Sequence, residues 1–125
     1  MRQLLIIFLG GGIGSIFRYM LGSVLNKDSF AYGTLMANIL GSLLIGFIMG
    51  LHIRSSGKAL SDNQLAFLVI GIFGGFTTFS TFMYENITLL YQGAYGRFFL
   101  YTLLSLSMGL VAAFAGFAGA KVLSA

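Results

Sequence analysis

The sequence predicts an all-helical membrane protein, a single domain over residues 1–125 that holds four transmembrane helices. Composition is the first observation behind this prediction. Hydrophobic residues make up 58% of the chain, charged residues only 8%, and mean hydropathy is +0.94, whereas soluble domains carry about 25% charged residues. The second observation is the pattern of polar interruptions. They leave four apolar stretches, approximately 4–25, 32–51, 65–91 and 98–122, each long enough to cross the ~30 Å hydrocarbon core as a helix.

Short connections join these stretches and leave no room for a soluble domain. The first stretch follows Arg2 in the manner of a signal peptide, but it lacks a small-residue cleavage site and continues past Arg18. We therefore predict that it is the first spanning helix. Four helices are too few to enclose a polar path alone, which favours an oligomer.

Residue usage excludes several classes of function. The chain has no Cys and a single imidazole, His52, which excludes disulfide chemistry and a His-based metal cluster within one chain. The net charge is +4, yet the basic residues are scattered towards helix ends and form no patch. Anionic lipid headgroups are therefore a simpler partner than nucleic acid.

The distribution of basic residues bears on topology. If the helices alternate in direction, the side with both termini carries Arg2, Arg54, Lys58 and Lys121, and the other side carries Arg18, Lys27 and Arg97. This near balance gives almost no positive-inside bias. Insertion in both orientations, and hence an antiparallel dimer of identical subunits, is physically available to such a chain.

The first helix combines close-packing residues with one basic side chain. Gly10 and Gly14 have the spacing that lets another backbone approach closely, so we expect a helix contact there. Arg18 lies beside Tyr19 further along the helix. Such a pair is typical of an interfacial anchor, and an Arg at a pore mouth would also concentrate anions. Both readings of Arg18 stay open.

The second helix carries a small and polar stripe, because Thr34, Asn38, Gly41 and Ser42 share one face at helical spacing. Small residues there favour close packing. Asn38 has a primary amide in mid-helix, which needs hydrogen-bond partners. It is expected either to bond to another helix or to donate to a permeating anion.

The third helix is predicted to break near its middle. Gly74 and Gly75 weaken a helix, and the hydroxyls of Thr77 and Thr78 can satisfy freed backbone groups. Broken helices in membranes line binding sites or pores, where exposed carbonyl oxygens suit Na⁺ and half-helix N-termini suit anions. If two subunits brought this break to a shared two-fold axis, their carbonyls could hold one cation.

Aromatic and hydroxyl side chains follow the break. Phe79 and Phe82 share a helix face, with Ser80 and Thr81 supplying hydroxyls beside them. Packing is the ordinary role of such rings, but their positive edges could also contact a small anion. Glu85 is the carboxylate inside this apolar span. It is expected to pair with a basic residue such as Arg18 or to act in proton coupling, and its position near the helix end favours the pair.

The fourth helix is rich in small residues, with Ala112, Gly116 and Ala120 at packing spacing. It also places Tyr101 and Ser105 one turn apart on one face, where their hydroxyls could continue a polar track. No nucleophile–base pair and no cofactor motif occurs in the chain. We therefore expect a passive channel and not an enzyme.

Together these features resemble the Fluc (CrcB-type) fluoride channel family over all four helices in order. The resemblance rests on a glycine-rich first helix ending in Arg18-Tyr19, Gly33-Thr34-Leu35 with Asn38 and Gly41, Gly74-Gly75-Phe76-Thr77-Thr78-Phe79-Ser80-Thr81-Phe82, and Glu85. It implies a dual-topology homodimer in the bacterial inner membrane, with two antiparallel fluoride pores and a structural Na⁺ at the dimer centre.

The resemblance also implies roles for particular residues. Phe79 and Phe82 would meet fluoride with their ring edges and Asn38 would donate its amide, while the carbonyls of Gly74 and Thr77 would bind Na⁺. The remaining matches are a vestibule arginine and polar residues along the route, namely Arg18, Thr34, Ser80, Thr81, Tyr101 and Ser105. One position departs from the pattern: Gly109 stands where some members carry a further hydroxyl.

The main rival from sequence is a small four-helix exporter of cationic compounds that exchanges protons at Glu85. Such a protein would place its carboxylate deep in the bundle, usually near Trp, and this chain has no Trp. A purely structural membrane protein is a second rival. It would not account for the polar residues along the route.

Overall fold

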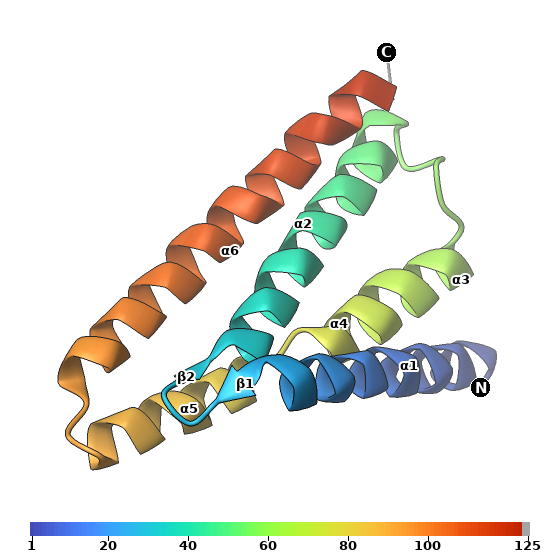
Figure 1. The fold of residues 1–125 in the computed structure, drawn as a ribbon. Helices are drawn as coiled ribbons and strands as arrows, with labels where there is room; N and C mark the ends of the chain where they lie inside the picture. The colour runs from blue at the N-terminus through green and yellow to red at the C-terminus, as the bar shows by residue number, and fades with distance from the viewer. Residues whose placement is uncertain (124–125) are drawn as a thin grey trace.

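The computed structural model describes residues 1–123, and it has four helices long and apolar enough to cross a membrane (Figure 1). The first two are α1 (Arg2–Leu25) and α2 (Tyr32–Arg54). The third span, Asp62–Tyr91, consists of α3 (Asp62–Leu65), η1 (Ala66–Phe73), α4 (Gly74–Phe76) and α5 (Phe79–Tyr91). The fourth is α6 (Tyr95–Leu123). The predicted multi-pass helical architecture is confirmed.

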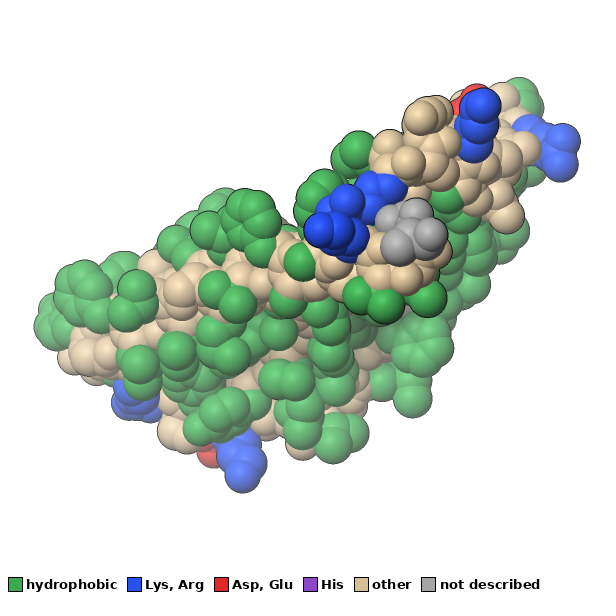
Figure 2. Space-filling model, turned by 90° about the horizontal axis from the view of Figure 1, so that it is seen from above, with side chains coloured by type: hydrophobic (Ala, Val, Ile, Leu, Met, Phe, Trp, Pro, Cys, Tyr) green, Lys and Arg blue, Asp and Glu red, His purple; other side chains and the backbone are tan. Residues whose placement is uncertain are grey.

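The surface of the molecule is apolar, as a lipid-facing protein requires. Large side chains such as Phe8 and Leu103 are mostly exposed, while many buried positions in the helices are small residues. Figure 2 shows a face covered largely by hydrophobic side chains, with few Lys and Arg side chains among them. Helix association in lipid therefore depends here on close backbone packing and on polar contacts.

Two pairs of helices pack closely at glycine residues. In one, α2 and α6 run side by side (Figure 1), and a Cβ added at Gly116 would collide with the Leu43 carbonyl oxygen. In the other, α1 crosses η1, where a Cβ at Gly10 would lie 2.6 Å from the Phe67 carbonyl oxygen. Ala112, Gly116 and Ala120 are all buried. The packing roles predicted for these glycines and alanines are confirmed.

A short hairpin joins α1 to α2 and was not predicted from the sequence. Its strands are β1 (Asn26–Lys27) and β2 (Phe30–Ala31), paired antiparallel. The Asn26 side-chain oxygen accepts hydrogen bonds from Gly33 N at 2.7 Å and Thr34 N at 3.4 Å, which caps the start of α2. Arg97 Nη1 donates to the Ser29 carbonyl at 3.1 Å, tying the hairpin to α6.

The third span is long and bent. Its η1 segment is wound as a π-helix, a rare form that is frequent at functional sites. Regular helix stops at Phe76 and resumes at Phe79. Between them, Thr77 (ψ 154°) and Thr78 (φ −152°, ψ 118°) have extended backbone, and the Thr78 hydroxyl caps α5 by accepting from Thr81 N at 3.2 Å.

Candidate functional site

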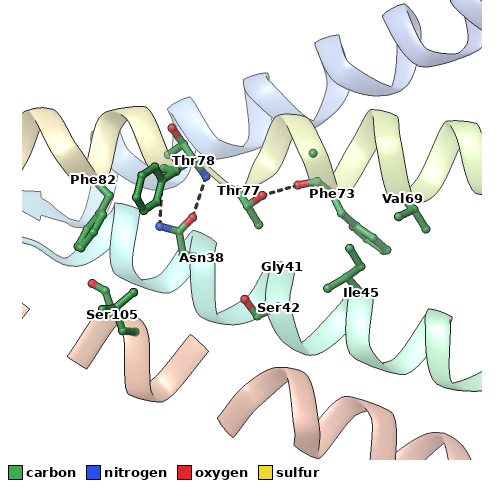
Figure 3. A pocket seen from close by; sticks show the side chains of 13 residues that line it. Asn38, Gly41, Ser42, Ile45, Val69, Phe73, Thr77, Thr78, Phe82 and Ser105 are labelled. Carbon is green, nitrogen blue, oxygen red and sulfur yellow. Dashed lines mark hydrogen bonds between the residues drawn. The ribbon is translucent and has the colours of Figure 1, made fainter. Parts of the chain in front are cut away.

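The site is centred on the two extended residues of the third span and on the α2 side chain that faces them. Asn38 Oδ1 accepts from Thr78 N at 2.7 Å, and its Nδ2 donates to the Thr78 carbonyl at 3.2 Å (Figure 3). Thr77 donates both N–H and Oγ1 to the Phe73 carbonyl, each at 2.9 Å. Of the two roles considered for Asn38, the interhelical bond is present, and one amide N–H is left over.

Absence of a side chain at Gly41 makes this contact possible. A Cβ there would collide with Thr77 Cγ2. Gly41 therefore lets α2 approach the extended segment closely enough for the Asn38 amide to reach Thr78.

Two backbone carbonyls at this point lose their regular helical partners. Thr78 N would donate to Gly74 O in a continuous helix, but it donates to Asn38 instead. Thr81 N would donate to Thr77 O, but it donates to the Thr78 hydroxyl. By contrast, the Gly75 oxygen accepts from Arg18 Nε at 3.1 Å. The Gly74 and Thr77 oxygens are thus among the carbonyl oxygens that the local fold leaves without a helical partner.

A cavity of about 280 Å³ opens beside the extended segment, between α2, the third span and α6. It is lined by Asn38, Gly41, Ser42, Ile45, Val69, Phe73, Gly74, Thr77, Thr78, Phe79, Phe82, Ser105 and Leu106 (Figure 3). The Ser105 hydroxyl is buried and has no hydrogen-bond partner among the described residues. Such an orphan group is costly unless something else binds it.

The two aromatic rings predicted to share a face are neighbours in space. The ring centroids of Phe79 and Phe82 lie 5.8 Å apart with the planes tilted by 44°. Phe82 is only 3% exposed and packs against the Tyr101 ring at 5.2 Å, whereas Phe79 is 66% exposed. Phe82 is therefore fixed by the bundle, and Phe79 sits at the surface of the single chain.

Glu85 is held by two hydroxyls. Thr34 Oγ1 donates to Glu85 Oε1 at 2.6 Å, and Tyr101 OH donates to Oε2 at 2.5 Å. Arg18 instead reaches the third span at Gly75. The pairing of Glu85 with Arg18 that the sequence favoured is wrong, because the α2 and α6 hydroxyls lie within reach of the carboxylate and Arg18 lies nearer the extended segment.

The other expected site residues fall into separate places. Arg18 lines a hollow of about 380 Å³ together with Thr34 and Thr81. Ser80 is exposed, with its hydroxyl 3.4 Å from that of Thr78. Tyr101 lines a smaller hollow of about 160 Å³ with Glu85, under the hairpin.

Two polar features escaped prediction. Ser42 was assigned to packing but lines the 280 Å³ cavity. Asn86 is buried in α5, where its Oδ1 accepts from Thr102 Oγ1 at 3.1 Å and ties α5 to α6. A polar residue inside an apolar span was the signal available for each of them.

A cluster of metal-binding side chains is absent from residues 1–123: no group of three or more His, Asp or Glu could hold an ion there.

Comparison with known proteins places the chain in a family. The family model for CrcB-like protein, Camphor Resistance (CrcB), matches residues 5–117. A protein of Bacteroides fragilis named fluoride-specific ion channel FluC is 41% identical over 122 residues, covering 93% of this chain and 94% of its own.

Relatives with the same name occur in other bacteria. The Thermus thermophilus protein is 42% identical over 120 residues, covering 94% of each chain. The Leptospira interrogans protein is 48% identical over 120 residues, covering 92% of this chain and 91% of its own. With its four spanning helices and its match along nearly the whole length, the chain belongs to the CrcB-like family.

Proposed function

We propose that this protein is a fluoride-specific channel that lets fluoride leave the cell passively across the bacterial inner membrane. The single observation that carries the proposal is the cavity beside Thr77 and Thr78, because the described residues lining it include hydroxyls and an amide but no acidic side chain. The names of the relatives support the choice of ion.

The chemistry of this lining suits fluoride. A small anion holds its water tightly and must receive replacement hydrogen-bond donors as it sheds that water. The free N–H of Asn38 and the unpartnered hydroxyl of Ser105 are such donors. The edges of Phe79 and Phe82 add weak positive charge. Without a fixed cation in the lining, the ion is not trapped.

Further hydroxyls would extend the route on either side of the cavity. Ser80 and Thr81 follow the extended segment, and Thr34 and Tyr101 lie beyond Phe82 with their hydroxyls on Glu85. Arg18 in its hollow would raise the local concentration of anions at the entrance. The proposed function requires no nucleophile and no chemical step.

The working form that we propose is an antiparallel, dual-topology homodimer with two pores. Support comes from the surface of the single chain, where Gly74, Phe79 and Ser80 are exposed in the middle of the third span. Exposed polar backbone and hydroxyls are costly in hydrocarbon. A second subunit would cover them, and the balanced basic residues permit either orientation.

A Na⁺ ion at the centre of that dimer is the remaining part of the proposal. The Gly74 and Thr77 carbonyls fit this role, because the hydrogen bonds that would occupy them go to Asn38 and to the Thr78 hydroxyl. Neutral oxygen ligands suit a hard cation. The ion would hold the two extended segments together and would take no part in moving fluoride.

Ion flux from proteoliposomes tests the function. Purified protein should release fluoride rapidly while chloride, a larger and more weakly hydrated ion, stays inside. Equal fluxes of the two ions would remove the fluoride assignment. Flux that stops without a proton gradient would favour the proton-coupled exporter.

Topology is tested separately with a reporter fused to the C-terminus. Signal is expected on both sides of the inner membrane, and two or three Lys added to one loop should force a single orientation. A single orientation in the unmodified protein would contradict the antiparallel dimer.

A further inference from the structure

Helix α6 has no hydroxyl side chain on its cavity side beyond Ser105 within residues 1–123. Tyr101 and Ser105 lie one turn apart, and the next turn brings Gly109, which has no side chain. Within residues 1–123, Ser105 Oγ is the buried hydroxyl that has no hydrogen-bond partner. On α6 the hydroxyls therefore end at Ser105, and position 109 leaves a gap one turn further along the helix.

A side chain from α2 lies next to this gap. Ser42 lines the cavity together with Ser105 (Figure 3). A Cβ built at Gly109 would lie 3.7 Å from Ser42 Oγ, an ordinary van der Waals contact. The Ser42 hydroxyl thus lies next to the place that a side chain at position 109 would fill.

The Ser42 hydroxyl also makes no hydrogen bond within the described part of the chain. A serine inside a helix often donates to the carbonyl four residues earlier, as Ser107 Oγ does to the Leu103 carbonyl at 2.6 Å. Ser42 makes no such bond with any described residue. Its donor is free to point into the cavity, one helical turn beyond Asn38.

We propose that Ser42 is a fluoride-coordinating residue. Its hydroxyl, on α2, supplies the hydrogen-bond donor that α6 lacks at Gly109. Asn38, Ser42 and Ser105 then surround the cavity with three donors from two helices. This inference rests on the proposed channel function and adds a residue to its pathway. A hydroxyl serves here because it donates a proton and reorients by rotation about a single bond.

The test compares fluoride flux from proteoliposomes for Ser42→Ala and for Ser42→Ala combined with Gly109→Ser. The single variant should conduct about tenfold more slowly, the effect of losing one hydrogen bond to a charged group. The double variant should recover most of the rate, because a hydroxyl at position 109 would reach the same space. A role of Ser42 in packing alone would not be rescued from the opposite helix.

Ser107→Ala is the matched control, since that hydroxyl is exposed and bonded to its own helix. It should conduct at the unmodified rate. If Ser42→Ala conducts as fast as the unmodified protein, or if Gly109→Ser fails to restore a slowed variant that elutes as intact protein, the role of Ser42 is wrong and the channel function stands. If the unmodified protein conducts no fluoride, the proposed function and this role both fail.

Discussion

Helix α2 makes two contacts of opposite character, one with α6 and one with the third span. Against α6 it packs on small residues, and a Cβ at Gly116 would collide with the Leu43 carbonyl oxygen. Against the third span it uses the Asn38 amide and leaves a cavity of about 280 Å³ beside it. The tightly packed contact thus fixes the relative positions of α2 and α6, the two helices that carry the hydrogen-bond donors around the cavity.

Breaking the dry contact should have the largest effect. Gly116→Leu places a branched side chain against the α2 backbone, which cannot move aside without separating the helices. We expect loss of folded protein, seen as aggregation during size-exclusion chromatography in detergent. Gly119→Leu is the matched control, because a Cβ there meets nothing within 4 Å. Gly116→Leu protein that elutes and conducts normally would contradict a close helix contact.

Changing the polar contact should spare the fold and suppress conduction. Asn38→Asp can still accept from Thr78 N but no longer donates to the Thr78 carbonyl, and it adds a negative charge to the cavity. Repulsion between this charge and fluoride should lower flux by about a hundredfold, since like charges in a site of low dielectric repel by several kcal/mol. Asn63→Asp, at the start of the third span and far from Asn38 along the chain, should conduct normally. Unchanged flux in Asn38→Asp would remove Asn38 from the pathway.

Replacing the two rings tests the cavity side of α5. Phe79→Ile and Phe82→Ile keep bulky apolar side chains but remove the positive ring edges, so fluoride flux should fall about tenfold while the protein still elutes intact. Phe99→Ile, on an exposed part of α6, is the control. Intact variants that conduct at the full rate would return both rings to a packing role.

The smallest effect is expected at the contact between Thr34 of α2 and Glu85 of α5. In Glu85→Gln the amide N–H can donate to one of the two hydroxyls, so the charge-assisted hydrogen bonds to the carboxylate are lost and neutral ones take their place. The loss should cost about 1 kcal/mol and lower the thermal unfolding midpoint by a few degrees. Asp62→Asn, exposed at the start of the third span, should leave the midpoint unchanged. No difference between the two variants would mean that the Glu85 contacts contribute nothing to stability.

The four helices could be predicted because hydropathy depends on composition within each segment. The break at Thr77 and Thr78 could be predicted because neighbouring glycines and hydroxyls mark it locally. The partners of Glu85 could not. They depend on the rotation and register of α2 and α6 relative to α5, which local sequence does not determine. The same holds for Ser42, because local sequence does not determine that Gly109 of α6 lies opposite it.

The α2–α6 contact also has a consequence for biosynthesis. These helices are separated by the whole third span, so α2 leaves the ribosome well before its partner has been made. The surface of α2 around Gly46 and Gly50 packs on α6 residues such as Ala113 and Phe117. Until α6 enters the membrane, that surface faces lipid or other proteins. The newly made chain therefore completes its tertiary structure only after its last helix has been inserted.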